Sequence, residues 1–216
     1  MDKRQIFFKN LNKNNSIIIP DHTAYGWADN PKQLVFSLSR YKFVSKMLQG
    51  YNEVLEIGAG DGFQSRLVDK EVKNLTLSDL FKEKKELFLK NKFKQNEFLI
   101  HDFIKKKIKK KFDAIYTIDV VEHIQKNNVN KFIKNIVASI KKEGVLIIGT
   151  PSLESQKYAS KFSKMGHVNC YTKSSLKKFM KNYFFNVFMF SMNDEVLHTG
   201  YDAMSHYLFA ICCNKK

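Results

Sequence analysis

A glycine-rich turn contains the residues best suited to hold a ligand. The apolar run at 54–57 predicts a buried strand, and Gly58, Gly60 and Gly62 predict the turn that follows it. From Phe63 the spacing of the apolar residues predicts a helix. A strand, a glycine turn and a helix in this order let the backbone approach a ligand closely and point helix N–H groups at it.

An acid at the end of the next predicted strand is a second candidate. The short apolar run at 74–80 contains Asp79, which lies 23 residues after Glu56. That is close to the spacing at which an acid binds a ribose hydroxyl in a strand–helix–strand unit. A carboxylate can accept hydrogen bonds from both ribose hydroxyls, so Asp79 and the adjacent Leu80 are expected at a nucleoside site.

Two strings in the chain carry a family resemblance. The order Glu-x-Gly-x-Gly-x-Gly at 56–62 resembles motif I of the class I S-adenosylmethionine (SAM) dependent methyltransferases and differs from the dinucleotide pattern Gly-x-Gly-x-x-Gly. The string Phe-Asp-x-Ile-x-x-x-Asp-x-x-Glu-His at 112–123 resembles a segment common in small-molecule members of that family. Together with Asp79 and Asp102, these motifs come in the family's order and extend the resemblance over about residues 32 to 213.

The resemblance implies an α/β, Rossmann-like class I methyltransferase fold. Its mostly parallel seven-stranded sheet would end in a C-terminal antiparallel hairpin and carry helices on both faces. The cofactor would be SAM, released as S-adenosylhomocysteine (SAH). In the family's pattern Asp102 would accept from the adenine amino group and Phe103 would cover the ring, although Asp102 can also be a simple turn residue. The residues expected to bind the cofactor are Arg40, Glu56, Gly58, Gly60, Asp79, Leu80, Asp102, Phe103 and Asp119.

Arg40 enters this set through its chemistry. It is one of three arginines, with Arg4 and Arg66, in a chain whose other basic residues are lysines. A guanidinium matches a carboxylate, and the methionine part of SAM carries one. A surface salt bridge is the alternative interpretation.

Two histidines are candidates for catalysis. Transfer to an oxygen or nitrogen atom requires a group that takes the acceptor's proton, and the pKa of histidine suits that task. His123 follows the fourth predicted strand, at the edge where ligands bind in open α/β sheets. The alternative is a histidine that packs beside Glu122. His167, in a polar loop after the fifth strand, is the second candidate. Glu122 could instead hold the acceptor or a metal, but without a second carboxylate cluster we expect transfer independent of a metal.

Periodicity predicts the elements that position these residues. Asp29-Asn30-Pro31 begins a helix that Gly50 ends. Further helices are expected at 81–94, 129–140 and 173–181, a turn at 142–144, and strands at 97–100, 112–119, 145–151, 184–192 and 204–213. Residues 31–216 would form one domain. Residues 1–30 would form an N-terminal arm in which Tyr25 and Trp27 belong to a loop or lid, or else anchor the arm to the body.

Composition restricts the class of protein. The 216 residues are 44% hydrophobic, as expected of a globular chain. No apolar run reaches the roughly 18 residues of a membrane span and no segment resembles a signal peptide, so we expect a cytoplasmic protein. The net charge of +16 comes mostly from lysines at the ends of elements, which makes a nucleic-acid partner an unfavoured interpretation. Cys212 and Cys213 are expected in a strand.

These observations predict a methyltransferase that acts on an O or N atom of a small, nucleotide-linked or carrier-linked molecule. Arg40-Tyr41 and the string Gly-His-Val-Asn-x-Tyr-Thr at 166–172 resemble bacterial sequences associated with surface-glycan and sugar modification. A sugar is therefore the expected acceptor. The alternatives are an RNA or protein methyltransferase and a non-catalytic binding protein with a SAM-type fold.

Overall fold

The computed structural model describes residues 2–5, 18–90 and 96–216. Within these residues one mixed sheet of eight strands has the order β3-β2-β1-β4-β5-β8-β6-β7. The strands are β1 Glu53–Ile57, β2 Asn74–Asp79, β3 Glu97–Ile100, β4 Phe112–Ile118, β5 Ile140–Pro151, β6 Phe184–Asn193, β7 Val196–His198 and β8 Tyr207–Lys215.

The sheet is parallel from β3 to β5 and antiparallel beyond it. This confirms the expected fold class and the terminal antiparallel pair, which is β6 with β8. The sequence predicted a sheet of seven strands, whereas the described residues form eight. The additional strand β7 lies between the expected strands at 184–192 and 204–213, and it pairs with β6 through a two-residue turn, where Asp194 has a φ of 49° as such hairpins require.

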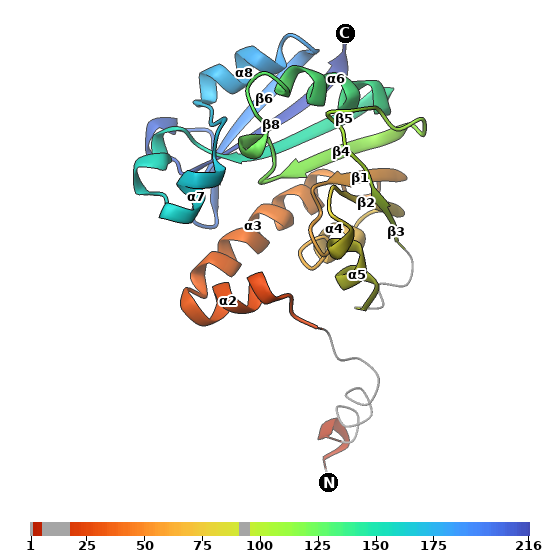
Figure 1. Cartoon of the computed structure of the whole chain (residues 1–216), viewed down its shortest axis with the longest axis vertical. Coiled ribbons are helices and arrows are strands. Elements are labelled where there is room, and N and C mark those ends of the chain that lie inside the picture. Colours follow the sequence, from red (N-terminus) through yellow and green to blue (C-terminus); the bar gives the residue numbers. More distant parts are fainter. Residues whose placement is uncertain (1, 6–17, 91–95) are drawn as a thin grey trace.

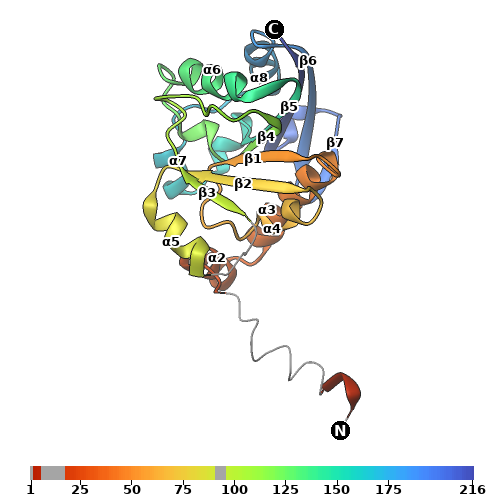
Figure 2. The same cartoon turned by 90° about the vertical axis from the view of Figure 1, so that its right-hand side faces the viewer.

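Helices cover both faces of the sheet (Figure 1). They are α2 Asp21–Asp29, α3 Lys32–Met47, α4 Arg66–Asp69, α5 Lys82–Lys90, α6 Val129–Ser139, α7 Lys161–Gly166 and α8 Lys173–Met180. One face carries α6 and α8, and the other carries α3, α4 and α5, as the turned view in Figure 2 also shows. α8 begins with a capping box between Thr172 and Ser175.

Each face has its own buried core. On one face Phe132 and Ile136 of α6 and Leu176 of α8 pack against the sheet. On the other face Tyr41 and Val44 of α3 do so. Apolar residues at helical spacing thus fix how each helix lies on the strands, and they bring α3 next to the carboxyl ends of β1 and β4.

Three predicted elements differ from the structure. The helix expected from Phe63 is the single turn α4, which buries Val68 but leaves Leu67 exposed. The segment at 120–124 was also expected to begin a helix, but it forms only a 3-10 turn, Val121–His123, and α6 starts at Val129. The turn expected at 142–144 belongs to β5, which begins at Ile140 because that residue pairs with Phe112.

The N-terminal arm also differs. Residues 21–29 form α2 instead of a loop, and Figure 1 shows this helix at the start of α3. Tyr25 is 71% exposed and Trp27 is 57% exposed, so these rings do not anchor the arm to the body. The apolar run at 16–19 also predicts a strand-like piece, but residues 16 and 17 lie outside the described residues, and Ile18 and Ile19 are not in a strand. A lid role for α2 stays a prediction.

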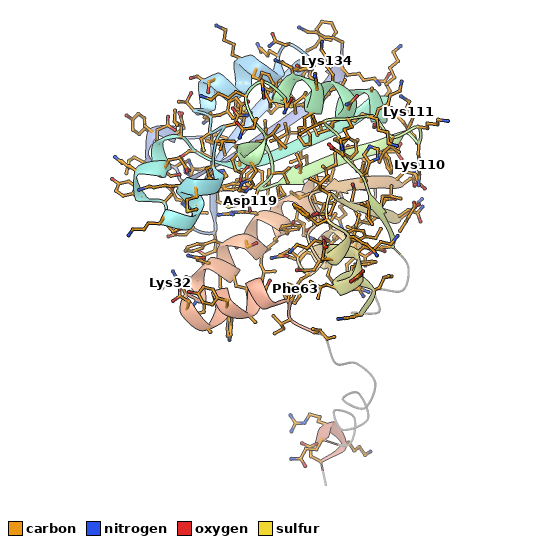
Figure 3. The ribbon with its side chains drawn as sticks, in the orientation of Figure 1. Lys32, Phe63, Lys110, Lys111, Asp119 and Lys134 are labelled. Carbon is orange, nitrogen blue, oxygen red and sulfur yellow. The ribbon has the colours of Figure 1, made fainter. Side chains whose placement is uncertain are left out.

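Other expectations concern the surface and the cysteines. The lysines at 105–107 and 109–111 are exposed, and Figure 3 shows Lys110, Lys111 and Lys134 at the rim of the molecule, away from Asp119. Cys212 is buried in β8, as expected for a strand residue. None of the helices in the described ranges is long and apolar enough to cross a membrane.

Candidate active site

The glycine turn has the backbone that its sequence requires. Gly58, Gly60 and Gly62 have φ values of 79°, 57° and 77°, in the region that favours glycine. A Cβ atom on Gly58 would lie 2.2 Å from Val120 Cγ2, whereas a Cβ atom on Gly60 would have no heavy atom within 4 Å. The space beside Gly60 is therefore open to a ligand.

Asp79 is fixed against this turn. Its Oδ2 accepts a hydrogen bond from the Gly60 N–H at 2.9 Å, and its Oδ1 accepts from the Phe81 N–H at 3.1 Å. Each oxygen keeps a further lone pair for a ligand hydroxyl. The neighbouring Leu80 is 53% exposed, so an apolar side chain lies next to the acid at the end of β2.

Asp102 and Phe103 follow β3, which pairs with β2 through Ile100 and Asp79. Asp102 Oδ1 accepts from the Ile104 N–H at 2.8 Å, as in a turn. The Phe103 side chain is only 2% exposed and packs edge-on against Phe132 in the core. Phe103 therefore supports this edge from inside, and the expectation that it covers a ligand ring does not fit its burial.

Arg40 and Asp119 form an ion pair, with Arg40 Nη1 2.8 Å from Asp119 Oδ2. Figure 3 places Asp119 where the end of β4 meets α3. The Arg40 guanidinium also lies 4.0 Å from the centre of the Tyr207 ring. Its Nε is buried and has no hydrogen-bond partner among the described residues, so the surface salt bridge considered for Arg40 does not describe its environment.

Glu56 lies inside the fold. Its side chain is fully buried, and its two oxygens accept hydrogen bonds from Tyr41 Oη at 2.7 Å and Tyr116 Oη at 2.6 Å. Burial raises the pKa of Glu56 to about 7, although the two phenol hydrogen bonds act in the opposite direction. Both carboxylate oxygens thus bind protein groups, and Glu56 links α3 to β1 and β4 beneath the glycine turn.

Glu122 is a second buried carboxylate, at the other side of the same edge. Its Oε2 accepts from Thr150 Oγ1 at 3.0 Å, whereas Oε1 is buried without a hydrogen-bond partner in the described part of the chain. Burial, with a smaller effect of nearby Asp119, raises the pKa of Glu122 to about 8. Its main-chain oxygen accepts from the Val168 and Asn169 N–H groups, which ties the loop after α7 to this turn.

The two candidate histidines lie together. The rings of His123 and His167 are 5.2 Å apart. His123 Nδ1 lies 2.9 Å from the Gly166 carbonyl oxygen, and His167 Nδ1 lies 2.8 Å from Gln156 Oε1. Because oxygen acceptors face both Nδ1 atoms, we assign the ring protons there, which leaves both Nε2 atoms unprotonated. Burial and the neighbouring His123 lower the pKa of His167.

Sequence reasoning did not select several residues that build this site. Only the folded chain brings these residues into contact with the site; they are Thr150, Gln156, Gly166 and Tyr207. Gly166 carried a signal, because it lies in the string at 166–172, and a Cβ atom there would be 3.1 Å from the His123 ring. A hollow of about 450 Å³ lies at the opposite edge of the sheet, where its lining includes Tyr51 and the ion pair of Lys141 with Asp113.

Comparison with known proteins identifies the family. A family model described as a methyltransferase domain matches residues 22–188. The chain belongs to the SAM-dependent methyltransferases. SAM is therefore the cofactor of this methyltransferase domain.

Two curated relatives are the ubiquinone biosynthesis O-methyltransferases of Rickettsia canadensis and Pelagibacter ubique. The first is 28% identical over 56% of this chain and 51% of its own length, and the second is 32% identical over 45% of this chain and 41% of its own length. The domain thus spans about half or less of these relatives. The N-methyltransferase NodS of Bradyrhizobium japonicum, solved with SAH, shares the fold, with a TM-score of 0.66, 17% identity, and coverage of 96% of this chain and 97% of the other.

Proposed function

We propose that the protein transfers the methyl group of SAM to an oxygen or nitrogen atom of a small or carrier-linked molecule. The observation that carries this proposal is the pair of histidines with free Nε2 atoms beside Glu122, at the edge that also carries the glycine turn. The similar proteins named above are O- and N-methyltransferases, which supports both acceptor atoms.

The residues at the edge fit the cofactor. Asp79 is held by two backbone N–H groups and would accept from the ribose hydroxyls, while Leu80 would pack on the nucleoside and Asp102 would accept from the adenine amino group. Arg40, whose Nε has no hydrogen-bond partner in the part of the chain that the structure describes, would bind the methionine carboxylate, and Asp119 would hold Arg40 in place. When bound, SAM supplies an electrophilic methyl group on a sulfonium, so the protein's tasks are orientation and removal of a proton.

His123 and His167 would remove the proton and hold the acceptor molecule. His123 is exposed, and its Nδ1 is fixed on the Gly166 carbonyl oxygen, which orients Nε2 as the atom that takes the proton from the attacking hydroxyl or amine. His167 would hold the acceptor from the second side. A general base contributes about 10²- to 10⁴-fold in rate.

We further propose a sugar of a surface glycan as the acceptor. The support is the string at 166–172, which resembles sequences associated with sugar modification and which contains His167. An RNA or protein acceptor is the second candidate, because a net charge of +16 favours anionic partners.

Release of SAH tests these assignments. The purified chain is incubated with SAM and, in separate reactions, nucleotide sugars, simple phenols and an RNA transcript. We expect SAH with a nucleotide sugar and none above background with RNA. SAH formed only with RNA would overturn the small-molecule acceptor, and SAH formed only with phenols would overturn the sugar. If calorimetry detects no binding of SAM to the purified chain, the proposed transfer of its methyl group is excluded.

A further inference from the structure

We infer that Glu122, His123 and His167 form a binding site for a divalent transition-metal ion. One ligand atom of each of the three residues lies within 4.8 Å of the others. Two neutral imidazoles and one carboxylate are a donor set that such ions accept, with coordination positions left open. This site differs from the metal-independent transfer expected from the sequence, in which His167 lies 44 positions after His123 and no second carboxylate cluster is present.

The fold holds the three residues at this distance. The Glu122 carbonyl oxygen accepts from the Val168 N–H at 2.8 Å and the Asn169 N–H at 3.0 Å, which fixes the loop that carries His167 against the turn that carries His123. The absence of a side chain on Gly166 lets that loop approach the His123 ring closely. The cluster is therefore a built part of the fold and does not depend on two flexible surface side chains.

The contacts around the cluster are those of metal ligands. A histidine that binds a metal usually donates its other ring N–H to a carbonyl or carboxylate oxygen, which fixes the ring. His123 has this contact with the Gly166 carbonyl oxygen, and His167 has it with Gln156 Oε1. Thr150 holds Glu122 Oε2, while Oε1 is fully buried and has no hydrogen-bond partner among the described residues. A buried oxygen without a partner is costly, and a cation would satisfy it.

The donor set selects the class of ion. Imidazole suits Zn²⁺, Co²⁺, Ni²⁺ and Fe²⁺, whereas Mg²⁺ prefers oxygen ligands and keeps its water. Bonds of about 2.0–2.2 Å place neighbouring ligand atoms about 3–3.5 Å apart, so the side chains close in slightly around the ion. The inference goes beyond the proposed function, because an ion bound to Nε2 of His123 would take the place of that nitrogen as proton acceptor. The ion would bind the acceptor oxygen and lower its pKa, so that its proton leaves to water.

Titration of the chelator-treated full chain with Co²⁺ tests the site, followed by visible absorption. We expect one Co²⁺ per chain, with the ligand-field bands of nitrogen and oxygen ligands and no thiolate charge-transfer band. His123→Ala and His167→Ala should each weaken binding at least 10-fold. The matched control His198→Ala, which changes a histidine outside the cluster, should leave affinity unchanged. Gln156→Leu removes no ligand and should weaken binding by about 10-fold, because it frees the His167 ring.

The outcomes separate this inference from the proposed function. Absence of a bound ion at millimolar Co²⁺, or equal affinity in the wild type and His123→Ala, would overturn the metal site. Methyl transfer that persists after chelator treatment would overturn it as a part of the reaction and leave the proposed function intact. One bound Co²⁺ without transfer to any small molecule would support the site and count against the proposed acceptor.

Discussion

Arg40 Nη1 and Asp119 Oδ2 lie 2.8 Å apart and join α3 to the end of β4, although the two residues are 79 positions apart in sequence. Asp119 has a φ of 56°, a left-handed conformation that costs a residue other than glycine about 1–2 kcal/mol. Strain of this kind persists where the surroundings hold it and is often found at functional sites. The ion pair thus holds a strained residue at the edge where we propose that the cofactor binds.

Replacing Arg40 should weaken cofactor binding. In Arg40→Ala the partner carboxylate of Asp119 loses its cation and the proposed methionine site loses its guanidinium. Charged hydrogen bonds contribute about 1.5–3 kcal/mol, so SAH should bind about 10- to 100-fold more weakly in calorimetry. Lys82→Ala is the matched control, because it removes an exposed cation 3.7 Å from Glu86 on α5. Equal SAH affinity in wild type and Arg40→Ala would exclude Arg40 from the cofactor site.

Replacing Asp79 should have a larger effect. The carboxylate is already held by the Gly60 and Phe81 N–H groups, so Asp79→Ala loses both the proposed ribose contacts and the shape of the turn. We expect at least 100-fold weaker SAH binding by calorimetry. Asp79→Asn keeps the size of the side chain, so its SAH affinity should lie between those of the wild type and Asp79→Ala. Glu86→Ala on the exposed face of α5 serves as the control, and an unchanged affinity in Asp79→Ala would contradict the ribose assignment.

The parts of this site that follow from the chain locally were predicted from sequence. A tight turn after a buried strand needs glycines at particular positions, and all three of them have positive φ values. The strands and the acid that ends β2 follow from the same short-range pattern. In these cases the sequence pattern that determines an element lies within the same short segment as the element itself.

The parts that depend on distant contacts were not predicted. Glu122 and His167 meet because main-chain N–H groups of a loop bind the carbonyl of a 3-10 turn, and neither segment has a period that shows this. The sequence predicts that Phe103 covers a ligand ring, but in the fold its side chain is buried against Phe132. The edge strand β7 was missed because its three residues are too few to show an alternating pattern, and the helix α2 was missed because its nine residues show little apolar periodicity.

Two glycines of the turn should respond differently to the same change. Gly58→Ala places a Cβ atom 2.2 Å from Val120 Cγ2, so thermal unfolding should occur at a clearly lower temperature. Gly60→Ala meets no atom within 4 Å and should suffer only the left-handed strain of about 1–2 kcal/mol. Its methyl group would occupy the proposed cofactor space, so SAH affinity should fall at least 10-fold in a chain that still folds. Normal SAH binding by Gly60→Ala would place the cofactor elsewhere.

Replacing His123 should separate chemistry from cofactor binding. His123→Ala removes the proposed proton acceptor but none of the residues proposed to contact SAM. We expect kcat to fall by about 10²- to 10⁴-fold while SAH affinity in calorimetry stays unchanged. His198→Ala, at the far end of β7, provides the matched control and should keep the wild-type kcat. If kcat of His123→Ala equals that of the wild type, another group takes the proton.

Glu56 should make the stability of the fold depend on pH. Its folded pKa of about 7 lies above the ordinary value of 4.5, so between these two values the folded state holds a proton that the unfolded state has released. The free energy of unfolding should therefore fall by about 3 kcal/mol as pH rises from 4.5 to 7, at about 1.36 kcal/mol per pKa unit. Denaturant unfolding of Glu56→Gln should lack this decrease.

Glu53, at the other end of β1, provides the control. A hydrogen bond with Lys110 lowers the pKa of Glu53, so Glu53→Gln should change the pH dependence of the free energy of unfolding in the opposite direction. Parallel pH profiles for wild type and Glu56→Gln would show that the Glu56 carboxylate ionises equally in the folded and unfolded states.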